Sequence, residues 1–132
     1  MTKSGKYKLA RQVAGKGAFA EVHLEIDAAP VFSLSFTDCD CTERLSTGEP
    51  VYSVAVAFGL RFAMEKLIFL RAYSGNYAVR VSRIYTMSVD STEAFVAYAA
   101  SKAFFSALGR SDDPMILDMT TRAILLSYDK TA

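Results

Sequence analysis

The chain is poor in the residues that build metal and redox centres, with one histidine and two cysteines among 132 residues. His23 therefore has no second histidine with which to complete a metal triad. Cys39 and Cys41 are one residue apart, too close to bridge each other, and they lack the second pair that a zinc site needs. We predict two free thiols, a reducing compartment, no metal and no cofactor.

Long apolar runs are also missing from the sequence. The longest, residues 54–60, ends at Arg61, far short of the roughly 20 residues that cross a membrane. No charged and then apolar leader segment opens the chain. These absences predict a cytoplasmic protein that does not engage a membrane.

Motifs for nucleotide binding and for catalysis are absent as well. Gly15-Lys16-Gly17 lacks the glycine spacing and the Lys-Ser/Thr ending of a phosphate loop, and it precedes a predicted strand instead of a helix. No Gly-x-Ser-x-Gly turn supports a serine nucleophile. We expect no nucleotide site and no enzymatic activity.

His23 is the remaining candidate for chemistry. It lies on the polar face of a predicted strand, beside Glu21 and Glu25. As a general base it would need a nucleophile or a metal nearby. The interpretation that we favour is a surface histidine that faces Arg80 or Ser82 across the sheet.

The composition supports one folded unit with an uneven distribution of charge. An apolar content of 52% can build a core, and the net charge is only +1. Five basic residues precede the first acidic residue, Glu21; they are Lys3, Lys6, Lys8, Arg11 and Lys16. We predict a flexible basic arm over residues 1–8, which is either simply solvated or binds phosphates, and a single domain over residues 9–129.

Alternation of apolar and polar residues predicts four strands. Residues 21–28 and 31–36 alternate, and the turn between them predicts an antiparallel hairpin. Further strands are expected over residues 77–85, with Val79 and Val81 inward, and over residues 122–128. Residues 37–49 form a loop that can carry a short element.

Two helices are expected, over residues 50–69 and 91–108. Pro50 suits a first helical turn, and Asp90 with Glu93 forms a capping box ahead of the second helix, which Gly109 can end. We expect Gly59 to lie where the alanine-rich second helix touches the first. The order strand, strand, helix, strand, helix, strand indicates an α+β two-layer sandwich: a mixed or antiparallel four-stranded sheet with two helices on one face.

Five segments of the chain, taken in order, resemble a known family. They are QVAGKGAFAEV (12–22), PVYSVAVAFG (50–59), AME (63–65), VDSTE (89–93) and PMILD (114–118). In this order they resemble domain IV of the translational GTPase elongation factor G over roughly residues 9–120. The resemblance implies a domain IV-like sandwich without the GTPase domain, and a functional tip made of two loops.

The resemblance assigns RNA contact to these two tip loops. The first contributes Arg11, Gln12, Gly15, Lys16 and Gly17, where glycines admit phosphates to backbone N–H groups and the cations neutralise them. The second contributes Met87, which replaces the family's tip histidine, and Ser88. It is shorter than in the family, with seven residues between Val81 and Val89, so it cannot probe the decoding site as the family does.

Two functions follow from these observations. The first is a non-catalytic module that binds RNA or the ribosome, with ribosomal RNA as the partner. The alternative is a protein-interaction or structural module that kept the fold without RNA binding. For this alternative the apolar first helix, with Val56, Leu60 and Leu67, predicts a homodimer face.

Overall fold

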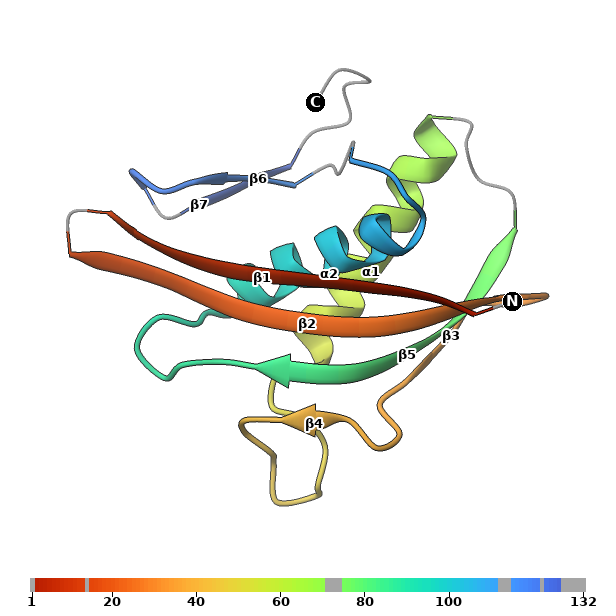
Figure 1. The fold of residues 1–132 in the computed structure, drawn as a ribbon, viewed down its shortest axis with the longest axis horizontal. Coiled ribbons are helices and arrows are strands. Elements are labelled where there is room, and N and C mark those ends of the chain that lie inside the picture. Colours follow the sequence, from red (N-terminus) through yellow and green to blue (C-terminus); the bar gives the residue numbers. More distant parts are fainter. Residues whose placement is uncertain (1, 14, 71–74, 112–114, 122, 127–132) are drawn as a thin grey trace.

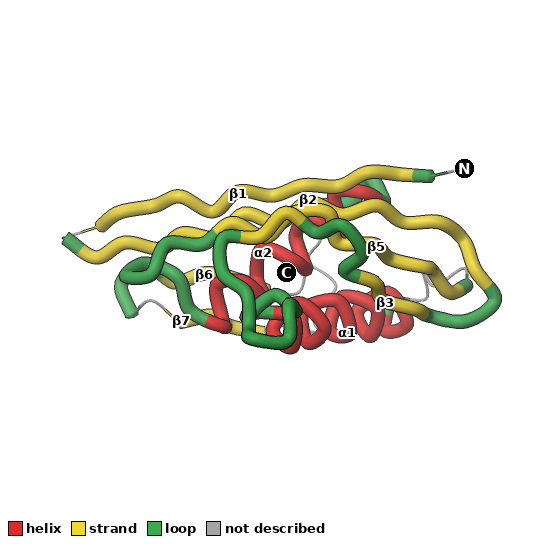
Figure 2. Tube along the Cα trace, turned by 90° about the horizontal axis from the view of Figure 1, so that it is seen from below, coloured by secondary structure: helices red, strands yellow, loops and turns green. Residues whose placement is uncertain are grey.

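A mixed sheet with both helices packed on one of its faces forms the body of the protein (Figures 1 and 2). The computed structural model describes residues 2–13, 15–70, 75–111, 115–121 and 123–126. The sheet strands are β1 (Lys3–Val13), β2 (Lys16–Ala29), β3 (Ser33–Ser35), β4 (Asp40–Cys41) and β5 (Asn76–Tyr85). The helices are α1 (Ser53–Phe69) and α2 (Glu93–Ala107), and a separate hairpin contains β6 (Met115–Asp118) and β7 (Ala123–Leu126). The α+β class is confirmed, with five strands in the main sheet instead of four.

The predicted flexible arm is wrong from Lys3 onward, because these residues form the edge strand β1. β1 pairs antiparallel with β2 along its whole length, from Lys3 opposite Ile26 to Val13 opposite Lys16. Gly5 lies against the backbone of α2, and the Tyr7 ring meets the Tyr98 ring edge-on. Residues 3–8 are therefore part of the sheet, and the domain begins before residue 9.

The predicted hairpin between residues 21–28 and 31–36 is also wrong. β2 pairs antiparallel with β1 on one side and with β5 on the other, which leaves no edge for β3. β3 instead pairs parallel with β5 at Ser33–Ser35, and the short strand β4 continues along the same edge of β5. Alternation shows which face of a strand is buried, but it does not choose the neighbouring strand.

The core lies between the helices and one face of the sheet. β2 buries every second side chain from Ala18 to Ile26, and β5 buries Val79 and Val81 as predicted. α2 lies across β1 and β2 and also contacts α1. The residues predicted for a homodimer face, Val56, Leu60 and Leu67, are buried in this core, so that assignment is wrong.

The two helices cross at Gly59, as expected. A Cβ atom on Gly59 would lie 2.3 Å from the carbonyl oxygen of Ala97, so the close approach requires glycine. α1 begins at Ser53, three residues after Pro50, which instead pairs with Arg44 in the preceding turn. Neither helix in the described part of the chain is long and apolar enough to span a membrane.

The ends of α2 confirm one prediction and correct another. Gly109 has φ of +71°, and the N–H groups of Gly109 and Arg110 donate to Ser106 and Phe105, which closes the helix with a glycine cap. The N-cap is Thr92, whose hydroxyl accepts from the Phe95 N–H at 3.1 Å. Asp90 is therefore not the cap, and its own N–H donates to the carbonyl of Met87.

The last predicted strand pairs outside the main sheet. β7 forms an antiparallel hairpin with β6, from Met115 opposite Leu126 to Asp118 opposite Ala123. This hairpin packs on the helix side of the molecule, where it contacts α2 (Figure 1). Residues 122, 127 and 128 of the predicted strand lie outside the described residues.

Candidate nucleic-acid interface

Two connections that are far apart in the sequence, β1–β2 and β5–α2, meet at one end of the sheet, which we call the tip. The tip consists of residues 11–13 and 15–17, on either side of the β1–β2 turn, and residues 86–91, between β5 and α2 (Figure 1). Arg11, Gln12, Gly17 and Met87 line one hollow of about 390 Å³. The structure therefore brings together four of the seven residues predicted for the site.

Backbone and side-chain hydrogen bonds fasten the second connection to β2. The Phe19 N–H donates to the Asp90 carbonyl at 3.0 Å. The buried Ser91 hydroxyl donates to the Phe19 carbonyl at 2.6 Å and accepts from the Met87 N–H at 2.8 Å. These hydrogen bonds place the Met87 backbone beside the first loop.

Gly17 permits this close contact. A Cβ atom at Gly17 would lie 2.5–2.6 Å from the carboxyl group of Asp90, inside van der Waals contact. The Asp90 carboxylate therefore rests directly on the backbone of Gly17. The glycine is required by the neighbouring loop, in addition to any approach of a ligand.

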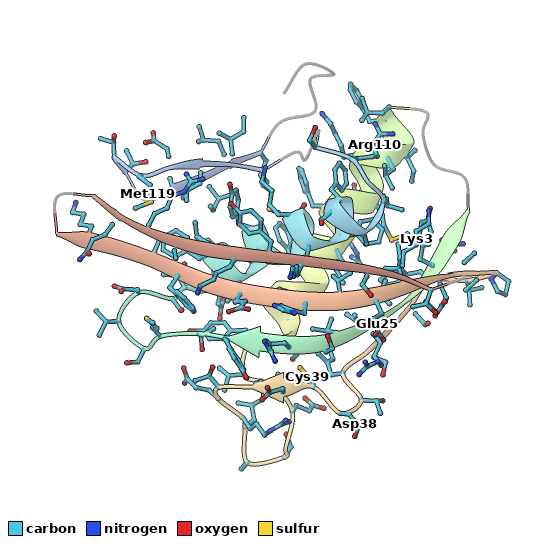
Figure 3. All side chains as sticks on the ribbon, in the orientation of Figure 1. Lys3, Glu25, Asp38, Cys39, Arg110 and Met119 are labelled. Atoms are coloured by element: carbon cyan, nitrogen blue, oxygen red, sulfur yellow. The ribbon has the colours of Figure 1, made fainter. Side chains whose placement is uncertain are left out.

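The remaining predicted residues lie at the outer part of the tip. Gly15 has φ of +79° and forms the β1–β2 turn, and Lys16 follows it as an exposed cation. Ser88 is exposed in the turn before α2 and does not line the hollow. Lys3 lies at the opposite end of β1, roughly 30 Å away at the usual rise per residue of a strand (Figure 3).

The charge of the tip is positive with one negative group inside it. Arg11 and Lys16 are exposed, and the Lys8 ammonium lies 5.9 Å from the centre of the Phe19 ring. The Asp90 carboxylate lines the same hollow. Cations at the rim can neutralise phosphates, while Asp90 disfavours an anion directly above Gly17.

Sequence reasoning missed five contributors to this hollow, the small side chains of Ala10 and Ala18 and the larger ones of Lys8, Phe19 and Asp90. The sequence pattern assigns Lys8 to a flexible arm and Asp90 to a helix cap. Met119, in the β6–β7 turn, lies at this same end of the molecule but does not line the hollow (Figure 3). Lys8 and Phe19 meet through the register of β1 on β2, and Asp90 joins them because the segment before α2 is hydrogen-bonded to β2; no short motif encodes either arrangement.

The face of the sheet that points away from the helices carries a network of charged side chains instead of a catalytic group. His23 Nε2 lies 2.7 Å from Glu21 Oε2, and Arg83 lies 3.9 Å from the same carboxylate and 3.8 Å from Asp40. His23 is paired in register with Arg83, so the expected neighbours Arg80 and Ser82 are wrong. The hydrogen bond from the Tyr85 hydroxyl to Asp40 raises the pKa of the phenol.

Cys39 and Cys41 are free thiols, as predicted. Burial raises the pKa of Cys39 to about 11, so its thiol stays protonated and unreactive at neutral pH. The described residues contain no group of three or more His, Cys, Asp or Glu side chains that could hold a metal ion.

Comparison with known proteins shows that the fold of this chain is similar to part of a protein of known structure. No protein-family model matches the chain, and no curated protein matches it. The fold is similar to part of a Thermus thermophilus protein of known crystal structure, with a TM-score of 0.61 and 23% sequence identity. The match covers 78% of this chain and 15% of that protein, so the chain corresponds to a small part of a larger molecule. At this identity the likeness concerns the fold alone.

Proposed function

We propose that this chain is a non-catalytic RNA-binding module that resembles elongation factor G domain IV and contacts ribosomal RNA in the cytoplasm through its tip. The observation that carries the proposal is the meeting of the two tip loops around one hollow. The resemblance assigns RNA contact to the equivalent pair of loops, and the described fold leaves both loops on the surface.

The side chains of the tip have the chemistry that RNA requires. Arg11 and Lys16 supply positive charge for phosphates, and Gln12 supplies both a donor and an acceptor for a sugar or base. Met87 is 52% exposed and offers a flexible apolar surface to a base. Because its backbone is fastened to Ser91, little ordering is needed when a ligand binds.

The first test removes the two exposed cations. We expect Arg11→Ala combined with Lys16→Ala to weaken binding of a small-subunit ribosomal RNA fragment. The negative slope of log K against log salt should become shallower by about 1.4. The reason is that fewer counterions are released from the RNA when the protein makes fewer phosphate contacts. Filter binding from low to moderate salt measures both quantities.

The matched control is Lys102→Ala on α2, where the ammonium lies 5.3 Å from the Tyr98 ring, away from the tip. This variant loses one positive charge but should keep the wild-type salt slope. Absence of RNA affinity in the wild type at low salt would contradict the proposal. Equal losses in Lys102→Ala and in the tip variant would show non-specific attraction instead.

A further inference from the structure

An apolar stripe runs along the outer side of α1, away from the core. Val54 is 80% exposed, Phe58 is 52% exposed and Ile68 is 58% exposed. With Arg61 and Glu65 between them, these residues follow helical spacings of three and four, so they lie on one face. We call these five residues the α1 stripe.

The α1 stripe has the ridges and hollows of a surface that packs against another. Val54 and Phe58 form a ridge between two hollows of about 480 Å³ and 440 Å³. The first hollow is bordered by Phe32 and extends along α1 to Ile68. The second lies between α1, α2 and the β6–β7 hairpin. An apolar ridge beside apolar hollows fits another surface of the same kind.

The charges of the α1 stripe are self-complementary. Arg61 and Glu65 are both exposed, and neither makes a hydrogen bond or an ion pair in the part of the chain that the structure describes. The pair Arg61 and Glu65 and the pair Phe58 and Ile68 are both centred on Ala63. Ala63 itself faces the core, and a two-fold axis that crosses the stripe at the level of Ala63 along α1 places opposite charges together and apolar side chains together.

We propose that the α1 stripe binds a second copy of this chain, with the two α1 helices antiparallel about a two-fold axis at the level of Ala63 along the helix. Arg61 then faces the partner's Glu65, and Phe58 packs against the partner's Ile68. Each contact occurs twice in such an isologous interface. A lipid surface is disfavoured as the occupant because two opposite charges lie in the middle of the stripe. This inference is independent of the proposed RNA contact.

The test is equilibrium sedimentation of the full chain across micromolar to submillimolar concentrations. We expect a dimer for the wild type and at least a hundredfold weaker association for Phe58→Asp, because the symmetry places the new charge twice in the apolar contact with the partner's Ile68. Leu45→Asp is the matched control. Leu45 is an exposed leucine in the loop before α1, and its variant should dimerise like the wild type.

Charge reversal tests the register itself. Arg61→Glu and Glu65→Arg alone place like charges opposite each other and should weaken the dimer at least tenfold. The double variant restores opposite pairs and should recover most of the wild-type association. Circular dichroism and thermal unfolding check that each variant is folded. They also measure any stabilisation of α1 itself in the double variant, because Glu four residues before Arg favours a helix.

Three outcomes would overturn the inference. They are a wild type that stays monomeric at submillimolar concentration, a Phe58→Asp variant that dimerises normally, and a double reversal that recovers nothing. The first outcome would leave the stripe to a different partner. The last would mean that the two copies meet in another register.

Discussion

Gly59 is the residue on which the packing of the two helices depends most directly. Its hydrogen atoms face the Ala97 carbonyl, and a methyl group there would overlap that oxygen at 2.3 Å. We expect Gly59→Ala to lower the free energy of unfolding by roughly 2 kcal/mol, because the overlap outweighs the helix propensity that alanine gains. Urea unfolding followed by circular dichroism measures the difference.

Ser106→Ala is the control for this prediction. Ser106 is exposed on α2, so the substitution should change the free energy of unfolding by less than about 0.5 kcal/mol. A Gly59→Ala variant as stable as the wild type would mean that α1 and α2 can move apart without loss.

At the residue scale, the sequence predicted structure best where a backbone geometry can be adopted by one residue type only. Gly59 and Gly109 were both assigned correctly, because a close crossing and a left-handed cap each require glycine. Asp90 was assigned wrongly, because both Asp90 and Thr92 can cap a helix. Asp90 also interacts with Gly17, which no local pattern encodes.

The start of α2 shows how one side chain controls an element. The Thr92 hydroxyl accepts from the Phe95 N–H, and Asp90 takes no part in this contact. We expect Thr92→Ala to lower the free energy of unfolding by about 1 kcal/mol, while Thr92→Ser retains the cap. Chemical denaturation of the two variants side by side separates loss of the hydroxyl from loss of the methyl group.

At the element scale, the alternation of apolar and polar residues predicted where strands lie better than it predicted which strands pair with each other. β2 and β5 were predicted because they alternate cleanly. β1 was missed because its lysines and glycine conceal the inward positions Tyr7 and Leu9. The partner of β3 was wrong because pairing depends on which edges remain open after the whole sheet has formed.

At the scale of the whole molecule, the tip and the α1 stripe are separate surfaces with no residue in common. We therefore expect Phe58→Asp to abolish dimerisation without changing RNA affinity per protomer. The Arg11→Ala and Lys16→Ala variant should lose RNA affinity and keep the dimer. Sedimentation and filter binding on the same preparations measure both properties, and a joint loss in either variant would mean that the surfaces are coupled.

The candidate site was only partly predictable at this scale. The resemblance indicated that two distant loops meet, and the structure brings Arg11, Gln12, Gly17 and Met87 together. The contributions of Lys8 and Phe19 depend on strand register, and that of Asp90 depends on how α2 seats against β2. Both follow from packing of the complete chain, so no segment taken alone could predict them.

The place of α2 across β1 and β2 has a consequence for the biosynthesis of this protein. The hairpin of β1 and β2 is synthesised before α2, with the apolar side chains of Leu9, Val22 and Ile26 turned to one side. The helix that covers that side, Glu93–Ala107, is made much later. A nascent chain of this kind carries an uncovered strand surface for a long stretch of its elongation, when chaperones or neighbouring nascent chains can reach it.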